Sequence, residues 1–182
     1  MTIEIICLVL FTVICLGISI TDSAISDIPN WLSLGLLGVS LIYYFTHLSS
    51  KTWYFPLIAS FGLLIICFII FVLFGETGIG GGDMKMLIIS LLCMNSSSIA
   101  FNYLLWYAGY TLCGYIITRF IKNKRYMSCG PYYSLALISA LFSSILTFKG
   151  YVFYVAFFSI ITLLGSSFYY SKVGVPYEEV LF

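Results

Sequence analysis

The chain has 182 residues, of which 62% are hydrophobic and only 8% are charged, with a net charge of +1. Soluble domains carry about 25% charged residues, so this composition excludes an ordinary water-soluble protein and indicates a polytopic membrane protein. The nearly neutral charge provides no field that would favour nucleic acid. The cysteines form no C-x-x-C pair, so neither a zinc site nor a disulfide framework is predicted.

Apolar stretches along the chain predict an all-α bundle of about seven transmembrane segments, forming a single membrane domain over residues 1–182. The stretches are 3–21, 31–47, 54–74, 84–94, 99–120, 131–148 and 151–170. The fourth is short beside the roughly 20 residues that a helix needs to cross a bilayer. Either the bilayer is locally thin there, or the fourth and fifth stretches form one bent hairpin.

Basic residues set the predicted orientation, because Lys and Arg are retained on the cytoplasmic side of membrane proteins. With seven spans, only Lys51 and Lys149 fall on one face. The opposite face holds Lys85, Arg119, Lys122, Lys124, Arg125 and Lys172. This distribution places the N-terminus outside and the loops 22–30, 75–83 and 121–130 in the cytoplasm.

Two acids stand at the predicted cytoplasmic ends of apolar segments. Asp22 closes the first segment in "ISITDSAISDIPNWL", and Asp83 ends the glycine-rich loop "GETGIGGGDMK". Carboxylates at a membrane boundary are costly to bury and usually functional. Two facing carboxylates share a proton, so that one activates a water while the other polarises a carbonyl, as in aspartic proteases. The pair therefore predicts acid–base chemistry.

The glycines beside Asp83 allow a second interpretation. Gly80 and Gly82 lack a Cβ, so they let the chain take an unusual conformation and let a substrate backbone approach the acid. However, a glycine-rich turn ending in Asp is also a sound helix N-terminus, with Asp83 as a simple cap of the fourth helix. Asp22 is equally compatible with a polar residue at the membrane edge. The residues alone leave both interpretations open.

Two motifs carry a family resemblance. "GIGGGDMKML" resembles the G-x-G-D motif of the type IV prepilin peptidases, and "DSAISDIPN" is similar to the other half of their site. Asp22, seven residues before Pro29, fits the family spacing, whereas Asp27 does not. "CGPYYSLALISALFSS" is similar to a late segment of the family. The likeness covers about residues 15–145 and leaves the apolar stretch 151–170 outside.

The resemblance implies a membrane aspartic endopeptidase, without metal or cofactor, that uses Asp22 and Asp83 as its catalytic pair. It would cleave the leader peptide of type IV prepilins or pseudopilins at the cytoplasmic face of a bacterial inner membrane, in pilus assembly or protein secretion. Residues expected to support the site or position the substrate are Gly80, Gly82, Lys85, Pro29, Asn30 and Glu76. The chain lacks the cysteine-containing insertion of the larger members, which leaves N-methyltransferase activity open.

An alternative from a different class is a small transporter or channel in which Asp22 and Asp83 form a cation or proton site. Such a site belongs near the bilayer midplane between repeated halves, and no repeat is visible here. His47 is the only histidine, and it falls near the predicted outer face, away from both acids. A catalytic or metal-binding role for His47 is therefore not predicted. Besides substrate and lipid no partner is indicated, and the oligomeric state is left open.

Overall fold

The computed structural model describes residues 2–25, 27–48, 52–74, 81–94, 96–116, 129–142 and 148–173. Within these ranges the chain forms seven helices and no strand, which confirms the all-α prediction. The helices are α1 (Thr2–Ile25), α2 (Asn30–Thr46), α3 (Phe55–Phe74), α4 (Gly81–Leu91), α5 (Ser97–Ile116), α6 (Gly130–Phe142) and α7 (Phe148–Val173).

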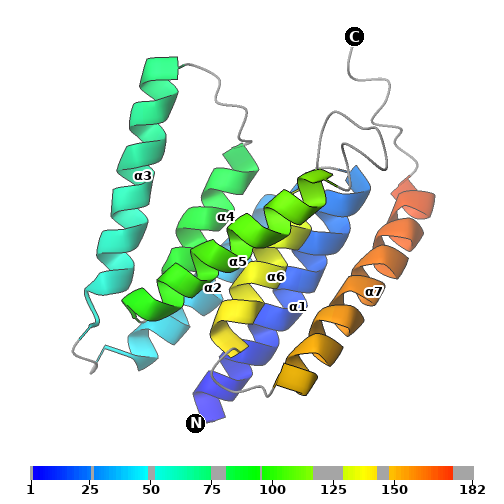
Figure 1. The fold of residues 1–182 in the computed structure, drawn as a ribbon, viewed down its shortest axis with the longest axis horizontal. Helices are drawn as coiled ribbons and strands as arrows, with labels where there is room; N and C mark the ends of the chain where they lie inside the picture. Colours follow the sequence, from blue (N-terminus) through cyan, green and yellow to red (C-terminus); the bar gives the residue numbers. More distant parts are fainter. Residues whose placement is uncertain are drawn as a thin grey trace.

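Consecutive helices run in alternating directions along the bundle (Figure 1). One end, called here the aspartate end, contains the last residues of α1 and the first residues of α2, α4 and α6. The opposite end, called here the N-terminal end, contains the start of α1 and the close of α2. The segments predicted to share the cytoplasmic face thus begin or end at the same end of the molecule.

Four helices form a closed ring that supports the aspartate end. Helix α1 packs against α2 and α6, and both of those helices pack against α4. In this ring α1 and α4 lie opposite each other. The remaining helices pack around it, α5 against α6, α3 against α4, and α7 against α1 and α6.

The sequence of α1 explains its central place. Cys7, Phe11, Cys15 and Ile18 recur every three or four residues and are almost fully buried, as expected for one face of an α-helix. Gly17 lets α2 approach, because a Cβ there would meet a side-chain carbon of Leu32 at 3.1 Å. A buried stripe on α1 therefore organises the helices around it.

Within the described residues, α1 is the helix that is both long and apolar enough to cross a membrane, over Ile3–Ile25. Several other apolar helices are shorter. Large apolar side chains also cover the outside of the bundle, and on α3 they include Ile58, Phe61 and Phe68. The seven-span bundle and its orientation remain predictions.

Helix boundaries differ from the predicted stretches at several places, and α1 ends at Ile25 rather than at residue 21, so Asp22 lies in a helix and not in the predicted loop 22–30. Helix α4 begins at Gly81 rather than at residue 84, so Asp83 lies inside its first turn and the alternative interpretation of Asp83 as the cap residue of this helix does not fit. Glycine costs a helix interior about 1 kcal/mol, but the first turn tolerates it, and an acid there is stabilised by the helix dipole. Helix α6 ends at Phe142, before the end of its predicted stretch 131–148. Helix α7 begins at Phe148, the last residue of that stretch.

Candidate active site

Asp22 lies in the last turn of α1 and continues the buried stripe of that helix. It follows Ile18 by four residues, which is one helical turn, and only 6% of its surface is exposed. Asp27, in the connection to α2, is exposed. The structure therefore separates the two acids of this segment, and Asp22 is the one enclosed by the bundle.

The carboxylate of Asp22 accepts a hydrogen bond from the backbone of α6. The N–H group of Gly130 donates to Asp22 Oδ2 at 2.5 Å. The first N–H groups of a helix have no partner within the helix, and its N-terminus attracts negative charge. Pro131 has no N–H group, and those of Tyr132 and Tyr133 both donate to the carbonyl of Cys129. Asp22 thus caps α6 from another helix.

Glycine at position 130 is required by this contact. A Cβ built there would lie 2.7 Å from both Cβ and Oδ2 of Asp22 and 3.0 Å from its Cγ. Real Cβ atoms do not approach other heavy atoms this closely, so any larger residue must displace the carboxylate or the helix. The absence of a side chain at Gly130 lets α6 begin directly against Asp22.

Asp83 is the third residue of α4, after Gly81 and Gly82, and its backbone lies at the aspartate end of the ring. Helix α4 stands across the ring from α1 (Figure 1). Both predicted catalytic acids therefore belong to the same end of the same four-helix ring. Their backbones come from helices joined through α2 on one side and α6 on the other.

The start of α2 links this end of the ring to α4. Pro29 precedes the helix, and its carbonyl accepts hydrogen bonds from the N–H groups of Leu32 and Ser33 at 3.0 and 3.3 Å. Asn30 Oδ1 accepts a hydrogen bond from Lys85 Nζ at 3.5 Å. Two predicted supporting residues, Asn30 and Lys85, are thus in contact across α2 and α4, and the third, Pro29, directly precedes Asn30.

The remaining predicted site residues divide into two groups. Gly80 and Glu76 lie outside the described residues, so their roles stay predictions. Gly82 lies in the first turn of α4 and is helical. The irregular backbone expected at Gly82 is therefore not found, because the helix starts before it.

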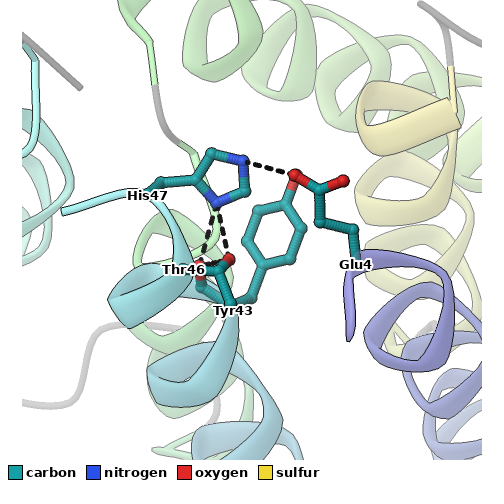
Figure 2. Close-up of polar contacts among 4 residues, drawn as sticks. All are labelled: Glu4, Tyr43, Thr46 and His47. Atoms are coloured by element: carbon teal, nitrogen blue, oxygen red, sulfur yellow. Dashed lines mark hydrogen bonds and ion pairs between the residues drawn. The ribbon is translucent and has the colours of Figure 1, made fainter. Parts of the chain in front are cut away.

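The N-terminal end of the bundle has a different polar group (Figure 2). His47 Nε2 faces Glu4 Oε1 at 3.6 Å, which links α2 to the start of α1. The other ring nitrogen, Nδ1, lies 2.9 Å from Thr46 Oγ1 and 3.0 Å from the carbonyl of Tyr43. His47 is thus at the opposite end of the bundle from Asp22, as predicted. Across the described residues, no three His, Cys, Asp or Glu side chains gather as metal ligands would.

Sequence reasoning missed the role of Gly130. The available signal was the Gly-Pro pair in "CGPYY", because proline is favoured in the first turn of a helix. The Gly-Pro pair predicts where α6 begins, but it does not predict which residue packs against this helix start. The partner, Asp22, is 108 residues away in the chain.

Comparison with known proteins identifies the family of the chain. The model of the type IV leader peptidase family matches residues 9–99. The matched segment runs from α1 to the beginning of α5 and contains both Asp22 and Asp83. No curated protein and no solved structure matches the chain. Because the match covers half of the 182 residues and contains both acids, the chain belongs to the type IV leader peptidase family.

Proposed function

We propose that this protein is a membrane aspartic endopeptidase that removes the leader peptide of type IV prepilins or pseudopilins, with Asp22 and Asp83 as its catalytic pair. The observation that carries the proposal is the enclosed carboxylate of Asp22 at the end of the ring where Asp83 lies in the first turn of α4. Both residues lie within the segment that the family model matches.

The chemistry needs one acid in each protonation state. The ionised carboxylate takes a proton from a water molecule, whose oxygen attacks the carbonyl carbon of the scissile peptide bond. The protonated carboxyl group donates a hydrogen bond to the carbonyl oxygen and stabilises its developing charge. The C–N bond then breaks, the amine takes up a proton, and a new carboxyl group and a new N-terminus are released.

The location of the acids favours cleavage at a membrane surface over ion transport. A transporter site belongs at mid-depth, where discontinuous helices surround an ion. Asp22 is instead in the last turn of α1, and Asp83 is in the first turn of α4. A substrate with a cytoplasmic leader followed by a membrane helix presents its cleavage point at this level.

Cleavage by the purified protein tests the proposal. Wild type, Asp22→Asn and Asp83→Asn, each in lipid, receive a prepilin with a basic leader, and mass spectrometry identifies the products. We expect the wild type to cut between leader and apolar helix, and both variants to leave the substrate intact. Asp27→Asn is the matched control, since that acid is exposed only five residues from Asp22, and it should cleave normally. An intact substrate with folded wild-type protein would refute the proposed activity.

We further propose that the aspartate end faces the cytoplasm of a bacterial inner membrane. Single cysteines at positions 27 and 48, in a background whose native cysteines are replaced by serine, report on the two ends of the bundle. Asp27 and Leu48 are exposed, so their replacements are open to thiol reagents. An impermeant reagent applied to intact cells should label position 48 and spare position 27. The reverse pattern would invert the orientation.

A further inference from the structure

We propose that Gly130, which lies outside the segment matched by the family model, is a positioning residue for Asp22. Its N–H group and its missing side chain together fix where the carboxylate points. This inference rests on the proposed function, because it assigns Gly130 a part in the reaction of Asp22. It also makes a structural claim, a direct contact between the start of α6 and Asp22, that can be measured without catalysis.

The contact fixes the carboxylate in two ways. The Gly130 N–H group holds Oδ2 through a hydrogen bond, and the space above its Cα receives the Asp22 side chain. Neither function survives a methyl group at position 130. The new Cβ would lie 2.7 Å from the Cβ of Asp22, which is fixed to the α1 backbone and cannot rotate away.

Neither helix can retreat far from the clash. Tyr133 is buried, and its ring stacks on Tyr107 of α5 with centroids 4.4 Å apart. Helix α5 therefore restricts movement of the first turns of α6. The rest of α6 is buried as far as Leu141. Helix α1 is confined by α2 and α7 on its other sides. Because the Asp22 Cβ cannot rotate away, the clash forces a small shift between α1 and α6, and this shift together with the Oδ2 contact displaces the Asp22 carboxylate from its position against Gly130.

Other tight glycines in the described part of the chain meet more adaptable neighbours. A Cβ at Gly165 would lie 2.6 Å from the terminal methyl group of Ile20, which can change rotamer. This clash involves α1 two residues before Asp22, yet it touches no acid. Gly165→Ala is therefore a matched control for a new methyl group pressed against the same helix.

The first experiment measures cleavage by Gly130→Ala and Gly165→Ala, with rates normalised to the folded fraction. A displacement of about 1 Å at a reacting group lowers a rate on the order of 100-fold, so kcat of Gly130→Ala should fall by about that factor. KM should stay unchanged, because a displaced Asp22 alters the chemical step and not the binding of the substrate helix. Gly165→Ala should keep the wild-type kcat. Normal kcat in Gly130→Ala, or an equal loss in both variants, would overturn the assignment.

The second experiment tests the contact by thermal unfolding alone. Gly130→Ala is made in the wild type and in an Asp22→Gly background, where the groups that would clash with the methyl group are absent. Contacting residues give non-additive effects, so the melting temperature should fall clearly in the wild-type background and much less in the Asp22→Gly background. Should Gly130→Ala alone fail to fold, recovery of folded protein in the double variant carries the same conclusion. Equal losses in both backgrounds would show that Gly130 and Asp22 do not touch.

The two experiments separate failure of this inference from failure of the proposed function. If the wild type cleaves no prepilin while the unfolding effects are non-additive, the peptidase assignment and the catalytic part of this inference fall, but the contact stands. If the wild type cleaves and the unfolding effects are additive, the positioning role of Gly130 falls and the peptidase assignment stands.

Discussion

Helix α1 carries an acid at each end of the same face, and the two acids meet different surroundings. Glu4 precedes Cys7 by three residues, and Asp22 follows Ile18 by four, so both continue the buried stripe of α1. The Glu4 side chain is 45% exposed and faces His47 at 3.6 Å. Asp22 is 6% exposed and accepts a backbone hydrogen bond at 2.5 Å.

The difference in exposure and contacts shows that the fold holds Asp22, and not Glu4, in a fixed position. The contact between Glu4 and His47 is an ion pair only when His47 is protonated, and an ion pair between exposed side chains contributes roughly 0 to 1 kcal/mol. A carboxylate enclosed between helices and held by a main-chain donor has little freedom to move, and leaving it unpaired costs about 1 to 3 kcal/mol or more. Asp22 therefore has the fixed geometry that acid–base catalysis requires, and Glu4 does not.

The largest effect should come from removing the charge at the Asp22 end of α1, and the same change at the Glu4 end is the control. Asp22→Asn should lower the cleavage rate on the order of 10² to 10⁴-fold, the usual contribution of a general acid or base. Glu4→Gln, the same change at the other end, should leave the rate unchanged. Cleavage assays on both variants test this contrast. Equal rates in the two variants would show that the enclosed acid has no special role.

A smaller effect on rate is expected across the ring, next to Asp83. Gly82 is helical, so Gly82→Ala meets no backbone strain, and under the proposed function the added methyl group lies near the substrate. We expect the rate to fall at least about tenfold, a cautious part of the cost of misplacing reacting groups. Gly38→Ala, in α2 with nothing within 4 Å of the new methyl group, is the control and should cleave normally. A fully active Gly82→Ala variant would exclude close substrate approach at this position.

The capping contact of Asp22 can be separated from its chemistry by comparing Asp22→Asn with Asp22→Ala. The asparagine carbonyl can still accept the Gly130 N–H group, whereas alanine leaves it without an acceptor. Loss of a helix cap costs about 1 kcal/mol, so Asp22→Ala should be less stable than Asp22→Asn by about that amount, and both should be inactive. Thermal unfolding in detergent measures the stability difference. Identical stabilities would mean that Asp22 does not cap α6.

The smallest effect is expected at the Glu4 end of α1, where the acid is partly exposed. Glu4→Gln removes the charge that faces His47 and should lower the free energy of unfolding by less than about 1 kcal/mol, as for other exposed ion pairs. Added salt should reduce even this difference, because charges near the surface are screened. Unfolding of both proteins at low and high salt measures it. A large, salt-independent loss would show that the two ends of α1 are more alike than their exposure indicates.

Local patterns in the sequence predicted much of this fold. The all-α class follows from apolar stretches separated by turns, and each described helix overlaps one of the predicted stretches. Asp22 stood out because an acid at the end of an apolar helix is costly. The start of α4 was predicted too late, because glycine propensity argues against helix and gives no account of the first turn.

Contacts between distant parts of the chain were beyond this reasoning. The pairing of Asp22 with Gly130 depends on how α1 and α6 pack, and no periodicity within either segment specifies it. The hydrogen bond between Lys85 and Asn30 is of the same kind, since it joins two helices whose relative position only the assembled ring determines. Sequence identified the acids, and tertiary packing decided what holds them.

The capping of α6 by Asp22 has a consequence for the order of events during synthesis. The segment matched by the family model, residues 9–99, is synthesised before α6. Until Gly130 has been added to the chain, Asp22 cannot form its hydrogen bond with the start of α6. The newly made chain therefore contains both acids well before it contains a finished site. Under the proposed function, packing of the sixth helix against α1 is then the step that completes the surroundings of Asp22.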